Sequence, residues 1–543
     1  MDLSLLTLDQ KIGQLFICGF HSLEADEQIR KLVKDYHVGG TVYFRRNVES
    51  VPQLAALSAD LQRLPRSLPD IPLFISIDQE GGMVSRLDHE GMSRIPGNMT
   101  LGAAGDVGLT QRTAELAAKE MIALGINFNF APCIDVNNNP ANPVIGVRSF
   151  GEDPDKVAEH GAAAIRGYQQ TGVIAAAKHF PGHGDTTVDS HRGLAVVPHD
   201  KQRLHRIELV PFVKAIGAGV DAIMTAHVAF PAFEPEGTPA TLSGRVLTDL
   251  LRGELGFEGV IVTDCLEMHA ISKSCGIAEG AVRAIEAGAD LVLVSHTLGD
   301  QIAAIRAVRE AVAVGRLSEE VINRSAGRVL ALKEKRIGKL PPAPEKKTSV
   351  PVPLTPQAES GALLTRVAES SVTLVKDTGN LPFDPAEGML VVWPELRHRT
   401  EVDEPAVHRY TLADALRRHG ERVSLSVIGT HPTEREIEDV LKQSRDFSQI
   451  VVVTYTAEGE IPEGQARLVQ DLNLLYGSRF VVVSSRNPYD LQYFPEVGTY
   501  LCLYENRSFA LDALANVLTG TTAPRGSLPV SLDSRYRAGF RLP

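Results

Sequence analysis

The segment between Lys178 and His191 contains the residues whose types and spacing best suggest chemistry. Its sequence is Lys178-His-Phe-Pro-Gly-His-Gly-Asp185, and it continues to Asp189-Ser-His191. Asp189 and His191 are two positions apart, so on an extended backbone both side chains point to the same side. A carboxylate that holds an imidazole makes a proton donor that works near neutral pH. The segment therefore predicts a general acid/base on a loop, with Asp189 orienting His191.

This loop follows an apolar run at residues 172–177, which we interpret as a buried strand. Across residues 1–339, short apolar runs alternate with amphipathic helical patterns such as Asp153–Thr171. Strands are expected at Leu15–Cys18, Thr41–Phe44, Leu73–Asp78, Asn127–Phe130, Ile174–Lys178, Ala222–Thr225, Val260–Asp264 and Leu291–Val294. The alternation predicts an α/β fold in which residues 1–339 form a (β/α)8 barrel of the TIM type.

A proline-rich segment at residues 340–356 follows the barrel pattern. Its six prolines exclude a helix and favour an extended linker. Residues 357–543 then resume the alternation, with strands expected at Val372–Lys376, Met389–Trp393, Val423–Val427, Ile450–Tyr455, Phe480–Ser484 and Tyr500–Tyr504. This pattern predicts a second, smaller αβα-sandwich domain with a mostly parallel sheet. It contains no glycine-rich phosphate loop, so a nucleotide site is not indicated.

Charged and titratable residues collect where the expected barrel strands end. These residues are Asp78, Arg86, Arg148, Lys178, His179, His227 and Asp264. Taken singly, some have a purely structural explanation: Asp264 could cap the next helix, and Asp78 could bind the N–H groups of the following glycine turn. Because the carboxyl ends of barrel strands meet at one rim, all of these side chains are expected to converge there. That convergence favours a catalytic site.

Several longer motifs accompany these residues along the barrel. They are Asp78-Gln-Glu-Gly-Gly, Asn142-Pro-Val-Ile-Gly-Val-Arg148-Ser-Phe-Gly, Lys178-His-Phe-Pro-Gly-His-Gly-Asp185, Asp189-Ser-His191, Met224-Thr-Ala-His227 and Thr263-Asp264-Cys-Leu-Glu-Met268. With them, residues 1–335 resemble the catalytic barrel of glycoside hydrolase family 3, in its β-N-acetylglucosaminidase branch. The later stretch Gly526-Ser-Leu-Pro-Val resembles the second domain of that family more loosely.

The resemblance implies a retaining, exo-acting enzyme that removes terminal N-acetylglucosamine, typically from muropeptides during cell-wall recycling or from chitin fragments. It implies that Asp264 is the nucleophile and that His191, held by Asp189, is the acid/base. The residues it assigns to sugar binding are Asp78, Arg86, Arg148, Lys178, His179 and His227. No metal and no cofactor are implied.

The acid/base assignment agrees with ordinary pKa values. A carboxylic acid would need its pKa raised by about two units to donate a proton at neutral pH. Imidazole, with an unperturbed pKa of roughly 6.5, needs little adjustment. Asp189 would select its tautomer and stabilise the imidazolium, as the carboxylate does in a serine-protease triad.

Three alternatives stay open at this point. A phosphorylase could use the same residues, since an imidazole does not repel phosphate as a carboxylate would; assays with and without phosphate distinguish the two. A metallohydrolase is suggested only by the clustering of His179, His183 and His191, whose spacing matches no familiar metal site. A non-catalytic sugar-binding protein would be expected to have lost Asp264 or His191, and both are present.

Composition restricts partners and location. The net charge of −12 argues against a nucleic-acid surface. Five scattered cysteines favour free thiols in a reducing compartment. The N-terminus has neither a basic region nor a long apolar core, and no apolar run reaches membrane-spanning length, so a cytoplasmic location without membrane contact is expected. The partner expected is a small carbohydrate substrate; no oligomer is indicated, and a monomer is favoured.

Overall fold

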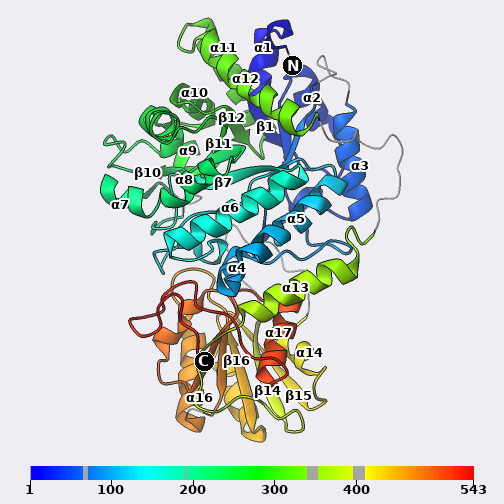
Figure 1. The fold of residues 1–543 in the computed structure, drawn as a ribbon, viewed down its shortest axis with the longest axis vertical. Helices are drawn as coiled ribbons and strands as arrows, with labels where there is room; N and C mark the ends of the chain where they lie inside the picture. Colours follow the sequence, from blue (N-terminus) through cyan, green and yellow to red (C-terminus); the bar gives the residue numbers. More distant parts are fainter. Residues whose placement is uncertain are drawn as a thin grey trace.

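The computed structural model describes residues 2–64, 71–189, 193–338, 352–395, 410–477 and 479–542. Figure 1 shows two domains along the long axis of the molecule, with the N-terminus in the first and the C-terminus in the second. Most of the linker expected at 340–356 lies outside the described residues. The α/β prediction of a barrel followed by a smaller sandwich is confirmed.

The first domain is a closed barrel of eight parallel strands. Their order around the barrel is β1-β12-β11-β9-β7-β6-β3-β2. The strands are β1 (Phe16–Gly19), β2 (Gly40–Tyr43), β3 (Phe74–Ile77), β6 (Phe128–Asn129), β7 (Ile174–Phe180), β9 (Ala222–Thr225), β11 (Val260–Cys265) and β12 (Leu291–Val294). Each one coincides with a strand expected from the sequence.

Helices cover the outside of the barrel. They are α1 (Leu8–Gln14), α2 (Glu27–Asp35), α3 (Val51–Gln62), α4 (Asn98–Ala104), α5 (Val107–Ala123), α6 (Pro154–Thr171), α7 (Lys201–Arg206), α8 (Val210–Gly217), the π-helix η5 (Arg245–Glu254), α9 (His269–Ser272), α10 (Ile277–Ala287), α11 (Leu298–Ala313) and α12 (Glu319–Arg336). Helix α6 shows how local sequence sets the bounds. Asp153 accepts hydrogen bonds from two N–H groups of the first turn, and Gly172 ends the helix in the left-handed region at φ 108°.

The second domain is built on a six-stranded sheet with the order β13-β18-β17-β16-β14-β15. Only the β13–β18 pair is antiparallel. The strands are β13 (Thr373–Lys376), β14 (Met389–Glu395), β15 (Val423–Gly429), β16 (Gln449–Thr454), β17 (Val481–Ser484) and β18 (Thr499–Cys502). The helices are α13 (Gln357–Ser371), α14 (Leu412–Leu416), α15 (Glu434–Gln443), α16 (Glu463–Tyr476) and α17 (Ser508–Leu518).

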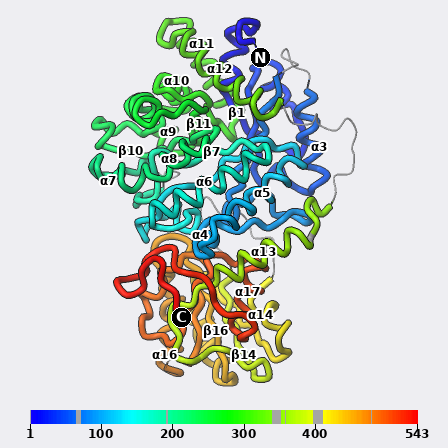
Figure 2. The backbone as a smooth tube through the Cα atoms, in the orientation of Figure 1, coloured from blue at the N-terminus to red at the C-terminus, as the bar shows by residue number. Residues whose placement is uncertain are grey.

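Alternate residues of the central strands feed two apolar clusters, one on each face of this sheet. Val452 and Val482 lie in one cluster, whereas Val451 and Val483 lie in the other. The first of these also contains Met99, Ala103 and Val147 of the barrel domain, and we refer to it as the shared cluster. Figure 2 shows α13 running along the boundary between the domains, where it contacts α4, α5 and α17.

No helix among the described residues is both long and apolar enough to cross a membrane.

Asp490 is a buried carboxyl group of the second domain. It lies in the 3-10 helix η7 (Pro488–Tyr493) and is 1% exposed. Thr454 and Thr456 donate hydrogen bonds to its two oxygens at 2.6 and 2.7 Å. Burial outweighs these hydrogen bonds and raises the pKa of Asp490 to about 6.

Replacing Asp490 with asparagine is expected to stabilise the protein more at about pH 7.5 than at about pH 4.5. Because the folded state binds the proton more tightly than the unfolded chain, the wild type loses stability as pH rises from near 4 to about 6. The shift corresponds to roughly 3 kcal/mol of unfolding free energy, which asparagine does not lose. Calorimetric Tm values of both proteins at the two pH values measure it, with Asp439→Asn, 73% exposed, as the control. A pH-independent Tm difference would contradict the assignment.

Candidate active site

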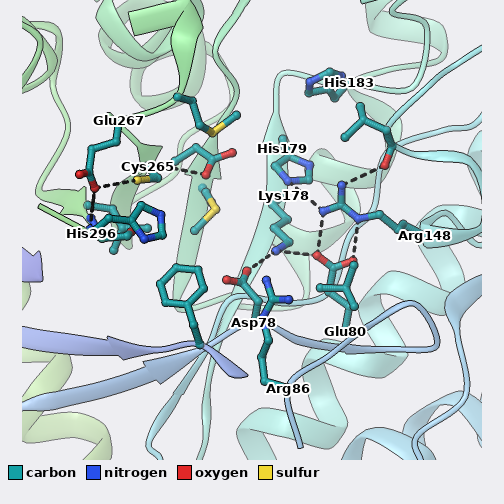
Figure 3. A pocket seen from close by; sticks show the side chains of 18 of the residues that line it. Asp78, Glu80, Arg86, Arg148, Lys178, His179, His183, Cys265, Glu267 and His296 are labelled. Carbon is teal, nitrogen blue, oxygen red and sulfur yellow. Dashed lines mark hydrogen bonds and ion pairs between the residues drawn. The ribbon is translucent and has the colours of Figure 1, made fainter. Parts of the chain in front are cut away.

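A cavity of about 320 Å³ lies at the carboxyl ends of the barrel strands. Its charged and imidazole side chains come from the last residues of β7 and β11 and from the segments that follow β3, β6, β7, β11 and β12. They are Asp78, Glu80, Arg86, Arg148, Lys178, His179, His183, Asp264, Glu267, His269 and His296. Figure 3 shows the Lys178 group and the Glu267 group on opposite sides of this cavity.

A buried ion-pair network forms one side. Lys178 Nζ lies 2.7 Å from Asp78 Oδ1 and 2.7 Å from Glu80 Oε1. Arg148 donates two hydrogen bonds to Glu80, at 3.0 and 2.8 Å. Burial alone would lower the pKa of Lys178 and raise that of Glu80, but the opposite charges outweigh it, so the Lys178 pKa is raised and the Glu80 pKa is lowered. Lys178, Glu80 and Arg148 are therefore charged at neutral pH.

Asp135 binds the two neighbouring histidines, His179 and His183. It is fully buried and accepts hydrogen bonds from His179 Nδ1 at 2.7 Å and from the His183 N–H at 2.6 Å. Arg148 lies 3.4 Å from His179 Nε2 as a donor. With a carboxylate at Nδ1 and a guanidinium at Nε2, we assign His179 the neutral Nδ1–H tautomer. Its Nε2 is then an acceptor held at the cavity wall.

The opposite side is built from β11 and the segment after β12. Asp264 lines the cavity at the end of β11, and its Oδ1 accepts the Cys265 N–H at 2.7 Å. Glu267 accepts backbone hydrogen bonds at 2.7 Å from both Ser295 and His296, which holds the second segment in place. The His296 ring lies 5.0 Å from the Phe44 ring. The Asp264 carboxylate, which accepts a hydrogen bond from the end of its own strand, thus lies across the cavity from the charged network of Lys178.

Cys265 follows Asp264 and also lines the cavity. Burial and the nearby charge of Glu267 raise the pKa of Cys265 to about 12. The thiol is therefore protonated at neutral pH, which makes it a poor nucleophile.

Six of the nine predicted site residues line this one cavity: Asp78, Arg86, Arg148, Lys178, His179 and Asp264. His227 does not. It is 0% exposed, its Nδ1 lies 2.8 Å from Thr241 Oγ1, and its Nε2 lies 3.0 Å from the Cys265 carbonyl oxygen. The expected substrate contact of His227 is corrected here, because both ring nitrogens bind protein atoms. His227 instead supports the end of β11 beside Asp264.

The predicted acid/base pair is only partly described. Asp189 is 4% exposed and lies on the loop after β7, outside the group of described cavity-lining residues. His191 lies outside the described residues. Its role as acid/base stays a prediction.

Sequence reasoning missed Glu80, Asp135 and Glu267. Glu80 is two positions after Asp78, so the alternation of an extended chain could have placed both on one side. Asp135 follows the fourth barrel strand, where a rim residue was expected. No nearby sequence pattern could have identified Glu267 as a site residue, since its partners are N–H groups 28 and 29 positions away.

Comparisons with known proteins identify the family of this chain. The profile of the glycosyl hydrolase family 3 N-terminal domain matches residues 7–332. A beta-hexosaminidase A of Pseudoalteromonas piscicida is 32% identical over 561 residues, which cover 93% of this chain and 91% of the relative. A beta-hexosaminidase of Stenotrophomonas maltophilia strain K279a is 40% identical over 288 residues, or 52% of this chain and 83% of the relative.

A solved structure is similar over nearly the whole length. It is a glycoside hydrolase family 3 beta-N-acetylglucosaminidase from Paenibacillus sp. str. FPU-7, with 50% identity and a TM-score of 0.93 over 97% of this chain and 99% of the other. A matching family profile, a relative that aligns over nearly the full length and a shared two-domain architecture lead to one conclusion. This chain is a glycoside hydrolase and belongs to glycosyl hydrolase family 3.

Proposed function

We propose that the enzyme is a retaining exo-β-N-acetylglucosaminidase in which Asp264 is the nucleophile and His191, oriented by Asp189, is the acid/base. One observation carries the proposal: Asp264 lines the same cavity as the charged network of Lys178, Glu80 and Arg148. A carboxylate facing a polar, preorganised wall suits attack on a sugar ring that the wall holds.

The proposed reaction has two displacements. Asp264 attacks the anomeric carbon while His191 protonates the departing glycosidic oxygen, which gives a glycosyl ester on Asp264 and a free alcohol. A water molecule then attacks the same carbon, His191 takes its proton, and the Asp264 carboxylate leaves. Two inversions at one carbon retain the β configuration.

The wall opposite Asp264 is proposed to select the sugar. Asp78, Arg86, Arg148, Lys178 and His179 would bind the hydroxyl and acetamido groups of the terminal residue. A site whose buried polar groups need partners discriminates strongly against a sugar that lacks one of them, because those groups are then left unpaired. N-acetylglucosamine is therefore expected to be preferred over glucose.

The decisive assay compares aryl N-acetylglucosaminide with aryl glucoside, each with and without phosphate and with and without a chelator. We expect turnover of the first substrate, release of free N-acetylglucosamine under all conditions, and no effect of chelation. Formation of a sugar 1-phosphate would replace hydrolysis with phosphorolysis. Equal turnover of both glycosides would contradict the proposed selectivity, and inactivation by the chelator would favour a metal-dependent reaction.

We further propose muropeptide fragments as the natural substrates, recycled in the cytoplasm, with chitin fragments as the alternative. The family resemblance supports the choice of muropeptide fragments over chitin fragments. Parallel digestion of N-acetylglucosaminyl-N-acetylmuramyl fragments and chitobiose, compared by kcat/KM, tests it. A preference for chitobiose would favour the alternative.

Replacing Glu80 with glutamine is expected to lower both stability and activity. Glu80 is 2% exposed and is the shared partner of Arg148 and Lys178, so the variant leaves two buried cations undercompensated, at a cost of roughly 3–5 kcal/mol. Displacement of these cations from the sugar is expected to lower kcat/KM about 100-fold. Tm and kinetics measure both effects. The control is Glu279→Gln, which removes an exposed pair with Arg316 and should change little; equal Tm losses in the two variants would contradict the argument.

A further inference from the structure

We propose that the second domain is a positioning device for the sugar-binding wall, acting chiefly through Arg507 and Tyr489. This inference rests on the proposed function, since it concerns how that site binds its sugar. Neither residue is among the described residues that line the cavity. They act through two barrel-domain segments that carry wall residues.

The first segment is a short hairpin of β4 (Gln79–Gly81) and β5 (Val84–Ser85), which contains Glu80 and directly precedes Arg86. Met83, at its turn, packs against the shared cluster of the second domain. Arg507 donates hydrogen bonds from Nε, at 3.2 Å, and from a terminal nitrogen to the carbonyl oxygen of Gly82. Its guanidinium also lies 3.1 Å from Asp88 Oδ1. The second domain thus contacts the hairpin turn at Gly82 and Met83, and the chain just after the hairpin at Asp88.

The second segment, residues 137–152, carries Arg148 and contains only one 3-10 turn, Gly146–Arg148. Val147, next to Arg148, lies inside the shared cluster. Asn137 Nδ2 donates to the Tyr489 hydroxyl at 2.9 Å. At the far end, Glu152 accepts hydrogen bonds from the Ser531 hydroxyl and N–H at 2.5 and 2.8 Å. Both ends and the middle of this segment are therefore fixed by the second domain.

The two segments meet in the buried Glu80–Arg148 pair. The mutual position of these side chains depends on both segments, and neither segment is part of a barrel strand. Because an ion pair with two parallel hydrogen bonds tolerates little displacement, release of either segment would misplace Arg148 in the wall that is proposed to bind the sugar. Arg507 and Tyr489 are positioning residues for substrate binding.

The test compares Arg507→Met and Arg507→Lys with the wild type on the aryl glycoside that the wild type hydrolyses. Arg507→Met is expected to raise KM and the inhibition constant of the free sugar in parallel, and to lower kcat/KM about 10- to 100-fold. Arg507→Lys, which keeps the charge, should recover part of the loss. Tyr489→Phe removes a single hydroxyl and should raise KM about threefold, so it decides the matter if Arg507→Met does not fold.

The matched control is Arg418→Met, which removes an exposed pair with Asp512 in the same domain and should leave KM unchanged. An unchanged KM and an unchanged inhibition constant in Arg507→Met would overturn the proposal. This holds even if kcat falls in proportion to a lost fraction of folded enzyme. If Arg507→Met does not fold, the same two constants of Tyr489→Phe decide. The same series of assays measures the selectivity of the wild type for the N-acetylglucosaminide over the glucoside. Failure of the proposed function is thus seen in the wild type, and failure of this inference in the variants.

Discussion

Asp264→Ala is expected to lower turnover of aryl N-acetylglucosaminides at least about 10⁴-fold, because the proposed covalent route depends on this carboxylate as its nucleophile. The side chain lies at the cavity wall and is partly exposed, so folding should be nearly intact. The variant loses the hydrogen bond from the Cys265 N–H, which contributes about 1 kcal/mol. Kinetics, together with Tm as the folding control, measure the result. A variant that keeps a tenth of the wild-type rate would exclude Asp264 as the nucleophile.

A second readout identifies the role of Asp264 more directly. The alanine variant leaves space for a small anion such as azide on the side of the anomeric carbon that Asp264 faces. Azide is expected to restore turnover of a substrate with a good leaving group and to form the α-glycosyl azide, since only one inversion then occurs. Asp264→Asn fills that space and should not be rescued. Rescue of both variants alike, or a β-azide product, would contradict a nucleophilic Asp264.

The barrel could be predicted because its signal is local. A strand such as Ile174–Phe180 is buried at every position, so it shows up as a short apolar run between helical patterns. Once eight such runs alternate with helices, closure of the barrel brings their carboxyl ends together. This is why Asp78, Lys178 and Asp264 could be placed in one site before any coordinates were known.

His227 shows where that rule stops. It follows β9 at the correct end of the barrel, but it is not among the described cavity-lining residues, and its ring nitrogens bind Thr241 and the Cys265 carbonyl. Beyond the last paired residue of a strand, the chain no longer alternates regularly, so the direction of a side chain depends on what the next segment packs against. That partner is a tertiary contact, which a strand-end rule does not contain.

The role of the second domain was even harder to predict from the sequence. The contact of Arg507 with Gly82 joins residues 425 positions apart, and the residues of the shared cluster alternate only within each strand. A sequence pattern shows that a residue such as Val147 is apolar, but not which domain buries it. The positioning of Arg148 is therefore a property of the assembled molecule.

The acid/base assignment predicts a loss that depends on the leaving group. His191→Ala should lower kcat/KM about 1000-fold for a disaccharide, whose alkoxide must be protonated as it departs. For a dinitrophenyl N-acetylglucosaminide, which needs little protonation, the loss should stay under about 10-fold. A series of aryl glycosides of increasing leaving-group pKa measures the dependence.

Asp189→Asn is the matched companion, because it keeps the imidazole and removes the charge beside it. If Asp189 orients and stabilises the imidazolium, its variant should show the same leaving-group dependence with smaller losses. His199→Ala supplies the control, since this imidazole of the same region binds Asp185 at 2.6 Å and does not line the cavity. Equal losses on the disaccharide and the dinitrophenyl substrate would mean that His191 acts in some step other than proton donation. If His191→Ala shows a strong leaving-group dependence and Asp189→Asn shows none, His191 is still assigned as the acid, but Asp189 is not its partner.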